Sequence, residues 1–152
     1  MSELRIGVVG CGAIGRDHIR RINEVIQRAH VVAVSDVNIE GGKKVAEQWN
    51  AQFFSDGEEM IRSELVDAVV VTTLDEFHEQ YVVAAIRAGK YVFCEKPLAP
   101  DADSCRRIMQ AEMEGGKHLL QVGFMRRYDQ GYRALKEIVS TRKYGEPLML
   151  HC

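Results

Sequence analysis

Apolar residues along this chain alternate between two spacings, and the alternation predicts a mixed α/β structure. Short, nearly continuous runs of Val, Ile and Leu are typical of strands buried on both faces of a sheet. The segments between them repeat apolar residues every three to four positions, as an amphipathic helix does. The expected strands cover residues 4–9, 31–34, 53–54, 66–71, 91–94 and 118–122. The expected helices cover residues 15–28, 40–49, a short stretch around 60–61, 76–88, 102–114 and 130–140.

Strands that alternate with helices predict a parallel sheet, because each helix carries the chain back across the sheet by a right-handed crossover. We therefore expect a doubly wound α/β fold of the Rossmann type. Asp56 and Asp101 stand where they would cap the third and fifth helices. Residues 148–152 resemble the start of another strand, and the sequence stops within it. We interpret the chain as either a deliberately shortened sequence or a fragment of a longer protein.

Composition narrows the class of protein. The 152 residues are 46% hydrophobic and 28% charged, as in an average soluble domain. A net charge of −2 gives no broad basic surface for nucleic acid. No apolar run approaches the roughly 20 residues that span a bilayer, and no signal-peptide pattern precedes the first strand. The four cysteines stand singly, without metal-ligand spacing, and favour a reducing cytoplasm.

A glycine motif follows the first expected strand and opens the first helix. Gly10, Gly12 and Gly15 form the pattern G-x-G-x-x-G, with Ala13 and Ile14 inside it. The first glycine permits a tight turn, the second lets a pyrophosphate approach the backbone, and the third lets helix pack on strand. The N–H groups and dipole of the helix then attract the phosphates. We expect these five residues to bind a dinucleotide.

An acidic residue at the end of the second strand favours NAD over NADP. Asp36 lies about 20 residues after Gly15, the spacing at which a carboxylate accepts both ribose hydroxyls and repels a 2′-phosphate. The next residue, Val37, is expected beside the same ribose, and no arginine follows it directly. Other readings stay open: Asp36 could only cap the turn. Enzymes that use S-adenosylmethionine or FAD also have related loops.

A second motif carries a family resemblance. Glu95, Lys96 and Pro97 follow the fifth expected strand, on the sheet edge where doubly wound folds bind ligands. Together with the glycine loop they resemble the Gfo/Idh/MocA family (glucose–fructose oxidoreductase, inositol dehydrogenase, rhizopine catabolism). Residues 91–99, 121–129 and 145–149 are similar to bacterial inositol 2-dehydrogenases in particular. The resemblance covers the whole chain, although related polyol and sugar dehydrogenases share much of it.

The resemblance assigns roles by position. Lys96 matches the family's active-site lysine, and Glu95 and Pro97 frame the nicotinamide end of the cofactor site. The family often has Thr-Pro-Asn before a helical histidine. This chain keeps Thr73 and His78 but has Leu74-Asp75 in place of Pro-Asn. Contacts from Thr73, Leu74 and His78 to the cofactor are therefore expected mainly through backbone atoms.

The resemblance also implies a reaction and a domain plan. The reaction is NAD-dependent oxidation of a secondary alcohol of a cyclic polyol or sugar, with myo-inositol giving 2-keto-inositol as the leading case. Arg127 matches a position in the family's active-site loop and is expected to line the substrate site. The plan has a Rossmann core over 1–122, an active-site loop and connecting helix over 123–147, and a further domain beginning at 148–152. That domain would bring an aspartate and a histidine to the site and form a homo-oligomer interface, so this chain alone should bind NAD without turnover.

Each of these assignments also has a purely structural alternative. The Lys-Pro pair could be an ordinary solvated turn, His78 could satisfy nearby backbone groups, and Arg127 could lie in a solvated loop. A non-catalytic module that senses NAD would need the glycine loop and Asp36, but it would not need Lys96. We therefore prefer an enzyme, with NAD as cofactor, a small polyol or sugar as substrate, and no metal, nucleic acid or membrane.

Overall fold

The computed structural model describes residues 3–149 and contains the alternating elements that the sequence predicts. The strands are β1 (Leu4–Val9), β2 (Ala29–Ser35), β3 (Gln52–Phe54), β4 (Ala68–Val71), β5 (Tyr91–Cys94) and β6 (Leu120–Val122). The helices are α1 (Ala13–Glu24), α2 (Ile39–Trp49), α3 (Gly57–Arg62), α4 (His78–Arg87), α5 (Ala102–Gly115) and α6 (Gln130–Thr141). Two short 3₁₀ helices, η1 (Asp75–Phe77) and η2 (Met125–Arg127), precede α4 and α6.

The strands form one parallel sheet in the order β3-β2-β1-β4-β5-β6. This order reverses between β1 and β4, so the loops after these two strands diverge and leave a crevice at their carboxyl ends. The order is that of a doubly wound Rossmann fold, which confirms the predicted fold class. It also fixes the position of any ligand site, because the glycine loop follows β1 directly.

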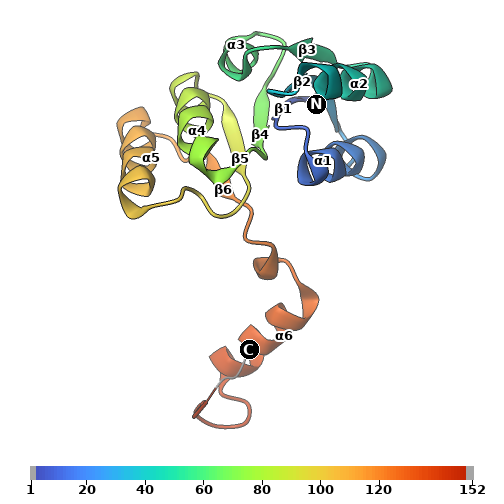
Figure 1. Cartoon of the computed structure of the whole chain (residues 1–152). Helices are drawn as coiled ribbons and strands as arrows, with labels where there is room; N and C mark the ends of the chain where they lie inside the picture. Colours follow the sequence, from blue (N-terminus) through green and yellow to red (C-terminus); the bar gives the residue numbers. More distant parts are fainter. Residues whose placement is uncertain (1–2, 150–152) are drawn as a thin grey trace.

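Helices cover both faces of the sheet, and each face has its own core (Figure 1). Successive residues of a strand point to opposite faces, so Ile6 and Val8 of β1 lie in one core and Val9 lies in the other. The first core includes Ile19 and Val45 and therefore belongs to α1 and α2. The second core belongs to α3, α4 and α5, whose buried apolar residues are Met60, Ile61, Val82, Ala85, Ile86, Ile108 and Ala111.

Several predicted boundaries were wrong by a few residues. The first helix ends at Glu24, and Val25 and Ile26, which lie within the predicted helix 15–28, are 66% and 53% exposed. Their N–H groups both donate to the carbonyl of Arg21, so the helix closes there and the chain turns back to β2. The fourth strand begins at Ala68 and not at Val66, whose N–H donates to the carbonyl of Ser63.

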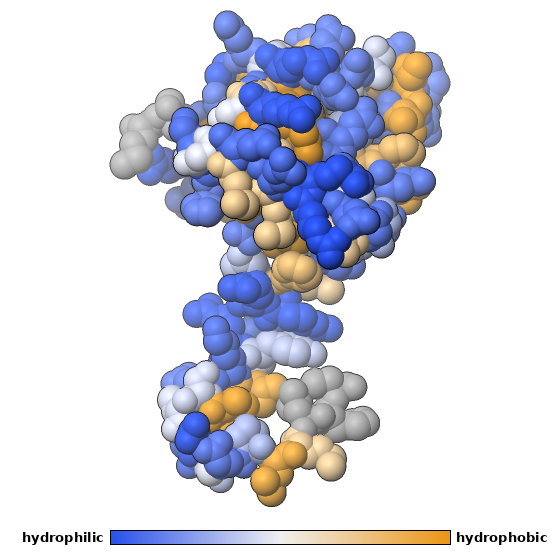
Figure 2. All heavy atoms as spheres, turned by 90° about the vertical axis from the view of Figure 1, so that its left-hand side faces the viewer, coloured by the Kyte–Doolittle hydropathy of each residue, from blue (hydrophilic) through white to orange (hydrophobic). Residues whose placement is uncertain are grey.

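The last described segment stands apart from the sheet. The α6 helix hangs below the Rossmann body in Figure 1, has no buried residue and packs mainly against η2. Figure 2 shows this smaller lobe joined to the body by a narrow neck, with apolar side chains on its surface. Leu148 and Met149 are exposed and form no strand, contrary to the prediction for 148–152, whose last three residues lie outside the described range. Over residues 3–149, no helix combines the length and apolar character needed to cross a membrane.

Candidate cofactor and active site

The glycine loop has the geometry that close approach of backbone and ligand requires. Gly10 has φ +95, and a Cβ there would lie 2.8 Å from the backbone of Thr72. A Cβ on Gly15 would lie 1.9 Å from the carbonyl oxygen of Gly10, so helix α1 can pack this closely only with glycine. Gly12 differs, because nothing described lies within 4 Å of its Cβ position. This open side is where a pyrophosphate could reach the backbone.

The N-terminus of α1 is free to receive an anion. Within the described chain its N-cap residue, Gly12, provides no side-chain hydrogen bond, and its first turn holds no acidic residue. The first N–H groups of a helix have no partner inside the helix, and the helix dipole places partial positive charge there. The loop from Gly10 to Gly15, with Ala13 and Ile14, therefore fits a pyrophosphate sterically and electrostatically.

Asp36 is held beside this loop. It follows β2, and its Oδ2 accepts a hydrogen bond from the N–H of Cys11 at 2.5 Å. Its Oδ1 accepts a hydrogen bond from the N–H of Asn38 at 2.7 Å. This is the contact expected if Asp36 caps the turn after β2. Asp36 therefore stabilises its own turn and also faces the glycine loop. The two bonds fix the carboxylate where the ribose next to a bound pyrophosphate would lie.

A cavity of about 720 Å³ opens along this edge of the sheet. It collects most of the predicted cofactor residues: Gly10, Gly12, Ala13, Ile14, Asp36, Val37, Thr73 and Leu74. It also contains residues that sequence reasoning missed: Asp56, Gly57, Phe77 and Tyr81. A Cβ on Gly57 would lie 2.7 Å from the Tyr81 ring, so this wall depends on packing between α3 and α4. No local pattern links these two residues, which are far apart in sequence.

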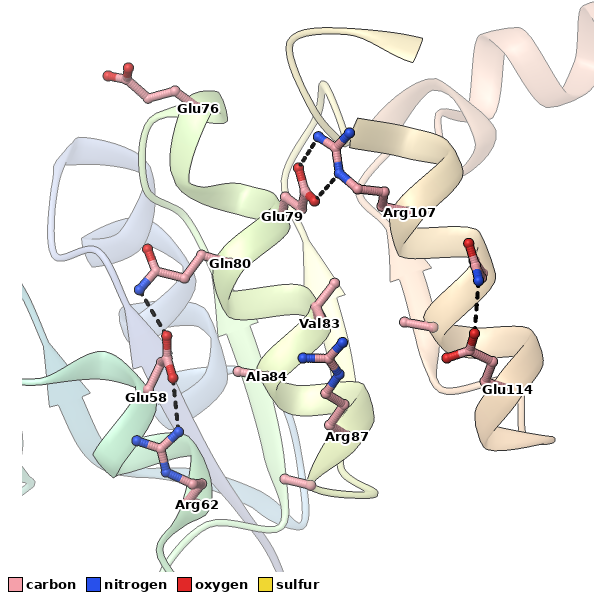
Figure 3. A pocket seen from close by; sticks show the side chains of 13 residues that line it. Glu58, Arg62, Glu76, Glu79, Gln80, Val83, Ala84, Arg87, Arg107 and Glu114 are labelled. Atoms are coloured by element: carbon pink, nitrogen blue, oxygen red, sulfur yellow. Dashed lines mark hydrogen bonds and ion pairs between the residues drawn. The ribbon is translucent and has the colours of Figure 1, made fainter. Parts of the chain in front are cut away.

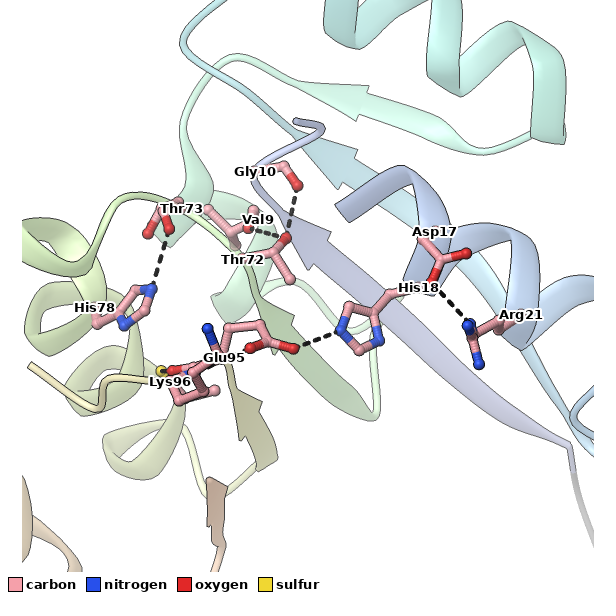
Figure 4. Close-up of polar contacts among 11 residues, drawn as sticks. Val9, Gly10, Asp17, His18, Arg21, Thr72, Thr73, His78, Glu95 and Lys96 are labelled. Atoms are coloured by element: carbon pink, nitrogen blue, oxygen red, sulfur yellow. Dashed lines mark hydrogen bonds and ion pairs between the residues drawn. The ribbon is translucent and has the colours of Figure 1, made fainter. Parts of the chain in front are cut away.

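Lys96 lies at the carboxyl end of β5, in the lysine turn (residues 95–97). The Lys96–Pro97 peptide bond is cis. The Lys96 side chain is exposed, and among residues 3–149 no hydrogen bond or ion pair occupies its ammonium group. Glu95 accepts a hydrogen bond from the N–H of Lys96 at 3.1 Å and contacts Nε2 of His18 at 2.9 Å (Figure 4). His18, on α1, is a contact that sequence reasoning missed.

His78 is the first residue of α4 and is 1% exposed. Its Nδ1 lies 2.8 Å from the carbonyl oxygen of Pro97, and its Nε2 lies 3.1 Å from that of Thr73. These contacts match the structural alternative for His78, in which the ring forms hydrogen bonds with nearby backbone groups. His78 is not among the residues that line the cofactor cavity, so any contribution to cofactor binding passes through the backbone that it holds.

Arg127 lies in η2, on the way to α6, and is exposed. Its neighbour Arg126 forms an ion pair with Asp129 at 3.6 Å and lies over the Tyr132 ring at 4.8 Å. The described part of the chain shows no contact between Arg127 and the lysine turn. A substrate role for Arg127 therefore stays a prediction.

Outside the cofactor cavity, the largest groove between helices has the features of a surface and not of a site. A groove of about 770 Å³ runs between α3, α4 and α5 (Figure 3). Two ion pairs line it, Glu79 with Arg107 and Glu58 with Arg62, and it contains none of the predicted site residues. Among the described residues no group of three or more His, Cys, Asp or Glu could hold a metal ion.

The buried cysteines are poor nucleophiles. Burial, followed by the charge of Asp36, raises the pKa of Cys11 to about 12. Burial, followed by the charge of Glu95, raises the pKa of Cys94 to about 12 as well. Both thiols therefore stay protonated near neutral pH.

The comparisons with known proteins agree with this geometry. The profile of the GFO_IDH_MocA oxidoreductase family, described as an NAD-binding Rossmann fold, matches residues 4–124. The chain belongs to this family. It therefore binds NAD, as the glycine loop and Asp36 predict.

Curated relatives within the family are named inositol 2-dehydrogenase. The proteins from Pseudomonas fluorescens and Azotobacter vinelandii are each 54% identical to this chain, over 99% and 98% of its length. The chain spans 45% of the length of each of these relatives. It therefore corresponds to less than half of such a family member.

Solved structures of family members have the same fold. Myo-inositol dehydrogenase from Lactobacillus casei, in complex with NAD(H) and myo-inositol, is 40% identical with a TM-score of 0.92. That comparison covers 96% of this chain and 44% of the solved chain. Scyllo-inositol dehydrogenase from the same organism, with NAD(H) and scyllo-inositol, is 31% identical with a TM-score of 0.88, over 93% and 42% of the two chains.

Proposed function

We propose that this chain is the NAD-binding part of an inositol 2-dehydrogenase that oxidises myo-inositol to 2-keto-inositol. The observation that carries the proposal is the position of Lys96. Its exposed ammonium group stands at the carboxyl end of β5, on the same sheet edge as the dinucleotide cavity. A module that only senses NAD would not need a lysine there. The myo-inositol assignment is supported by relatives of that name at 54% identity.

The residues of this chain divide the work of binding and proton transfer. The glycine loop holds the pyrophosphate, Asp36 and Val37 face the adenosine ribose, and residues 73–74 line the path toward the nicotinamide. Glu95 and Pro97 frame the nicotinamide end. When bound, NAD supplies a hydride acceptor. Lys96 binds the substrate hydroxyl at its Nζ and helps to move the proton away as the alcohol becomes a ketone.

The rest of the enzyme is part of the same proposal. Residues 1–122 form the Rossmann core, residues 123–147 form the active-site loop with its connecting helix, and Arg127 lines the substrate site. A further domain begins at 148–152, adds an aspartate and a histidine to the site, and forms the interface of a homo-oligomer. A cytoplasmic location is supported by the free thiols of Cys11, Cys94 and Cys105.

Turnover by the full-length enzyme tests the proposal. The protein that contains this chain is assayed for NADH formation with myo-inositol, scyllo-inositol and glucose, as wild type and as Lys96→Ala. We expect myo-inositol to give the highest kcat/KM, and we expect Lys96→Ala to lower kcat by about 100- to 10,000-fold. Binding of NAD should persist in the variant.

Lys117→Ala is the matched control. Lys117 is also an exposed lysine, but it precedes β6 and therefore lies at the amino ends of the strands, away from the cofactor cavity. It should leave turnover unchanged. A wild-type protein that binds NAD but oxidises none of the polyols would reject the proposal. Equal activity of Lys96→Ala and wild type would reject the role of Lys96.

A further inference from the structure

His78 connects the two loops that meet on the nicotinamide side of the site. One is the β4 loop (residues 72–74), which lines the cofactor cavity, and the other is the lysine turn. The ring lies between them, with Nε2 at 3.1 Å from the Thr73 carbonyl and Nδ1 at 2.8 Å from the Pro97 carbonyl. It is 1% exposed, so water cannot take the place of either contact.

The lysine turn has few other attachments. The N–H of Glu95 donates to the Val71 carbonyl at 2.9 Å, which ends the pairing of β5 with β4. The Glu95 side chain contacts His18 on α1, as Figure 4 shows. Both contacts hold the turn before Lys96. After Lys96, one side-chain hydrogen bond among residues 3–149 holds the turn, and it joins His78 to the carbonyl of Pro97.

We propose that His78 is a positioning residue that sets Lys96 relative to the cofactor, through one ring nitrogen for each loop. The inference rests on the proposed function and assigns a separate role to each nitrogen of the ring. Nδ1 holds the lysine turn and therefore governs the chemical step. Nε2 holds the β4 loop and therefore governs the affinity for NAD.

Hydrogen-bond chemistry makes this division testable. A backbone carbonyl only accepts, so each contact is a hydrogen bond when the facing ring nitrogen carries a proton. The two carbonyl oxygens lie 2.8 Å from Nδ1 and 3.1 Å from Nε2, so the proposed division needs a donor at each position. The amide nitrogen of asparagine can occupy nearly the place of Nδ1, and that of the longer glutamine can occupy the place of Nε2. Each substitution therefore keeps one donor and removes the other.

The experiment compares His78→Asn with His78→Gln in the full-length enzyme. His78→Asn keeps the bond to Pro97 and should raise KM for NAD by about tenfold with kcat close to wild type. His78→Gln keeps the bond to Thr73 and should lower kcat by about 10- to 100-fold with KM for NAD nearly unchanged, because a small displacement of a catalytic group is costly. Ile108→Val removes a methyl group from the core beneath α3, α4 and α5. It is the control for the effect of lost stability alone.

The crossed pattern would support the inference. Equal changes in the two variants, or a change no larger than that of Ile108→Val, would overturn it. Wild-type turnover with myo-inositol in the same assay keeps this result separate from the proposed function. If that turnover is absent, the proposed function fails, whatever the variants do.

A measurement on the wild-type protein covers the case in which a variant does not fold. Nitrogen NMR of protein with ¹⁵N-labelled histidine identifies which ring nitrogens of His78 carry protons. We expect a proton on each of the two ring nitrogens, because each faces a carbonyl oxygen that only accepts. A ring with a proton on only one nitrogen can hold only one of the two loops and would overturn the inference.

Discussion

At the scale of single residues, Asp36 links cofactor choice to loop structure. Its carboxylate accepts from the backbone of Cys11 and of Asn38, so it stands beside the glycine loop before any ligand arrives. A negative charge fixed there attracts ribose hydroxyls and repels a 2′-phosphate. We therefore expect the preference for NAD to arise at the junction of β2 and the glycine loop.

Replacement of Asp36 should reduce the difference between the affinities for NAD and for NADP. We expect Asp36→Ala to weaken NAD binding by about 10- to 100-fold, since about 1.4 kcal/mol corresponds to a factor of ten and two hydrogen bonds to a charged acceptor are lost. Binding of NADP should not weaken to the same degree. Calorimetric titration of the chain with each nucleotide measures both effects. An unchanged ratio of the two affinities would contradict this account of Asp36.

Arg5 and Asp67 form an ion pair whose contribution depends on pH. Arg5 donates from Nε and Nη2 to the two oxygens of Asp67, at 3.0 and 2.7 Å, and its backbone N–H adds a third bond. These hydrogen bonds lower the pKa of Asp67 from 3.8 to about 2. A lowered pKa stabilises the fold fully above pH of about 4, and the contribution is lost as the pH falls toward 2.

Asp67→Asn should therefore lower the free energy of unfolding at pH 7 by about 1 kcal/mol, a small value because both side chains are partly exposed to solvent. The difference from wild type should shrink below pH 4 and be largely lost by pH 2. Urea unfolding across this range measures it. Asp103→Asn breaks an exposed pair within α5 and should have little effect at any pH. A deficit in Asp67→Asn that is the same at pH 7 and pH 2 would contradict the assignment.

At the scale of elements, the sequence predicted every strand and helix of the sheet but not all of their ends. Periodicity records which residues face the core, and for α1 it extended past Glu24 because Val25 and Ile26 continue the apolar spacing. The helix ends there for a geometric reason, since β2 begins at Ala29 and the chain has few residues in which to turn. Boundaries of this kind depend on tertiary structure and not on local pattern.

The candidate site divides in the same way. The glycine loop, Asp36 and Lys96 each follow a strand within a recognisable motif, so their meeting at one sheet edge follows from the fold. His18 and Tyr81 belong to no such motif. His18 reaches Glu95 across 77 residues of sequence, and this contact exists only because α1 packs near β5. Side chains that complete a site from neighbouring helices were therefore not predictable here.

The short helix α3 shows how a cap can serve both an element and the site. Asp56 accepts from the N–H groups of Glu58 and Glu59 and also lines the cofactor cavity. Asp101 has the same capping role on α5 through the N–H of Ser104, outside the cavity. We expect Asp56→Ala and Asp101→Ala each to lower the free energy of unfolding, by about 1 kcal/mol for Asp56→Ala.

Only Asp56→Ala should also change NAD affinity, because its helix forms one wall of the cavity. Thermal unfolding with and without NAD compares the two variants directly, since a bound ligand raises the unfolding temperature according to its affinity. An equal NAD-induced shift in Asp56→Ala and wild type would mean that this wall does not contact the cofactor.

At the scale of the whole molecule, the described chain consists of a packed sheet domain and a helix without a partner. The α6 helix has no buried residue, although Tyr132, Ile138 and Val139 give it an apolar side. Leu148 and Met149 add further exposed apolar surface. An apolar surface of this kind is costly in water unless another surface covers it. Because the chain spans 45% of the length of its curated relatives, we expect the remaining part of the protein to cover it.

The isolated chain should therefore self-associate through this surface. We expect oligomers that grow with concentration in sedimentation velocity experiments, and we expect Val139→Lys combined with Leu148→Lys to give mostly monomer. Met113→Lys is the matched control, because Met113 is equally apolar and 78% exposed but lies on α5 in the sheet domain. It should leave the association unchanged. A chain that stays monomeric at every concentration would show that the apolar side of α6 needs no partner, and it would remove the reason to expect that the rest of the protein covers it.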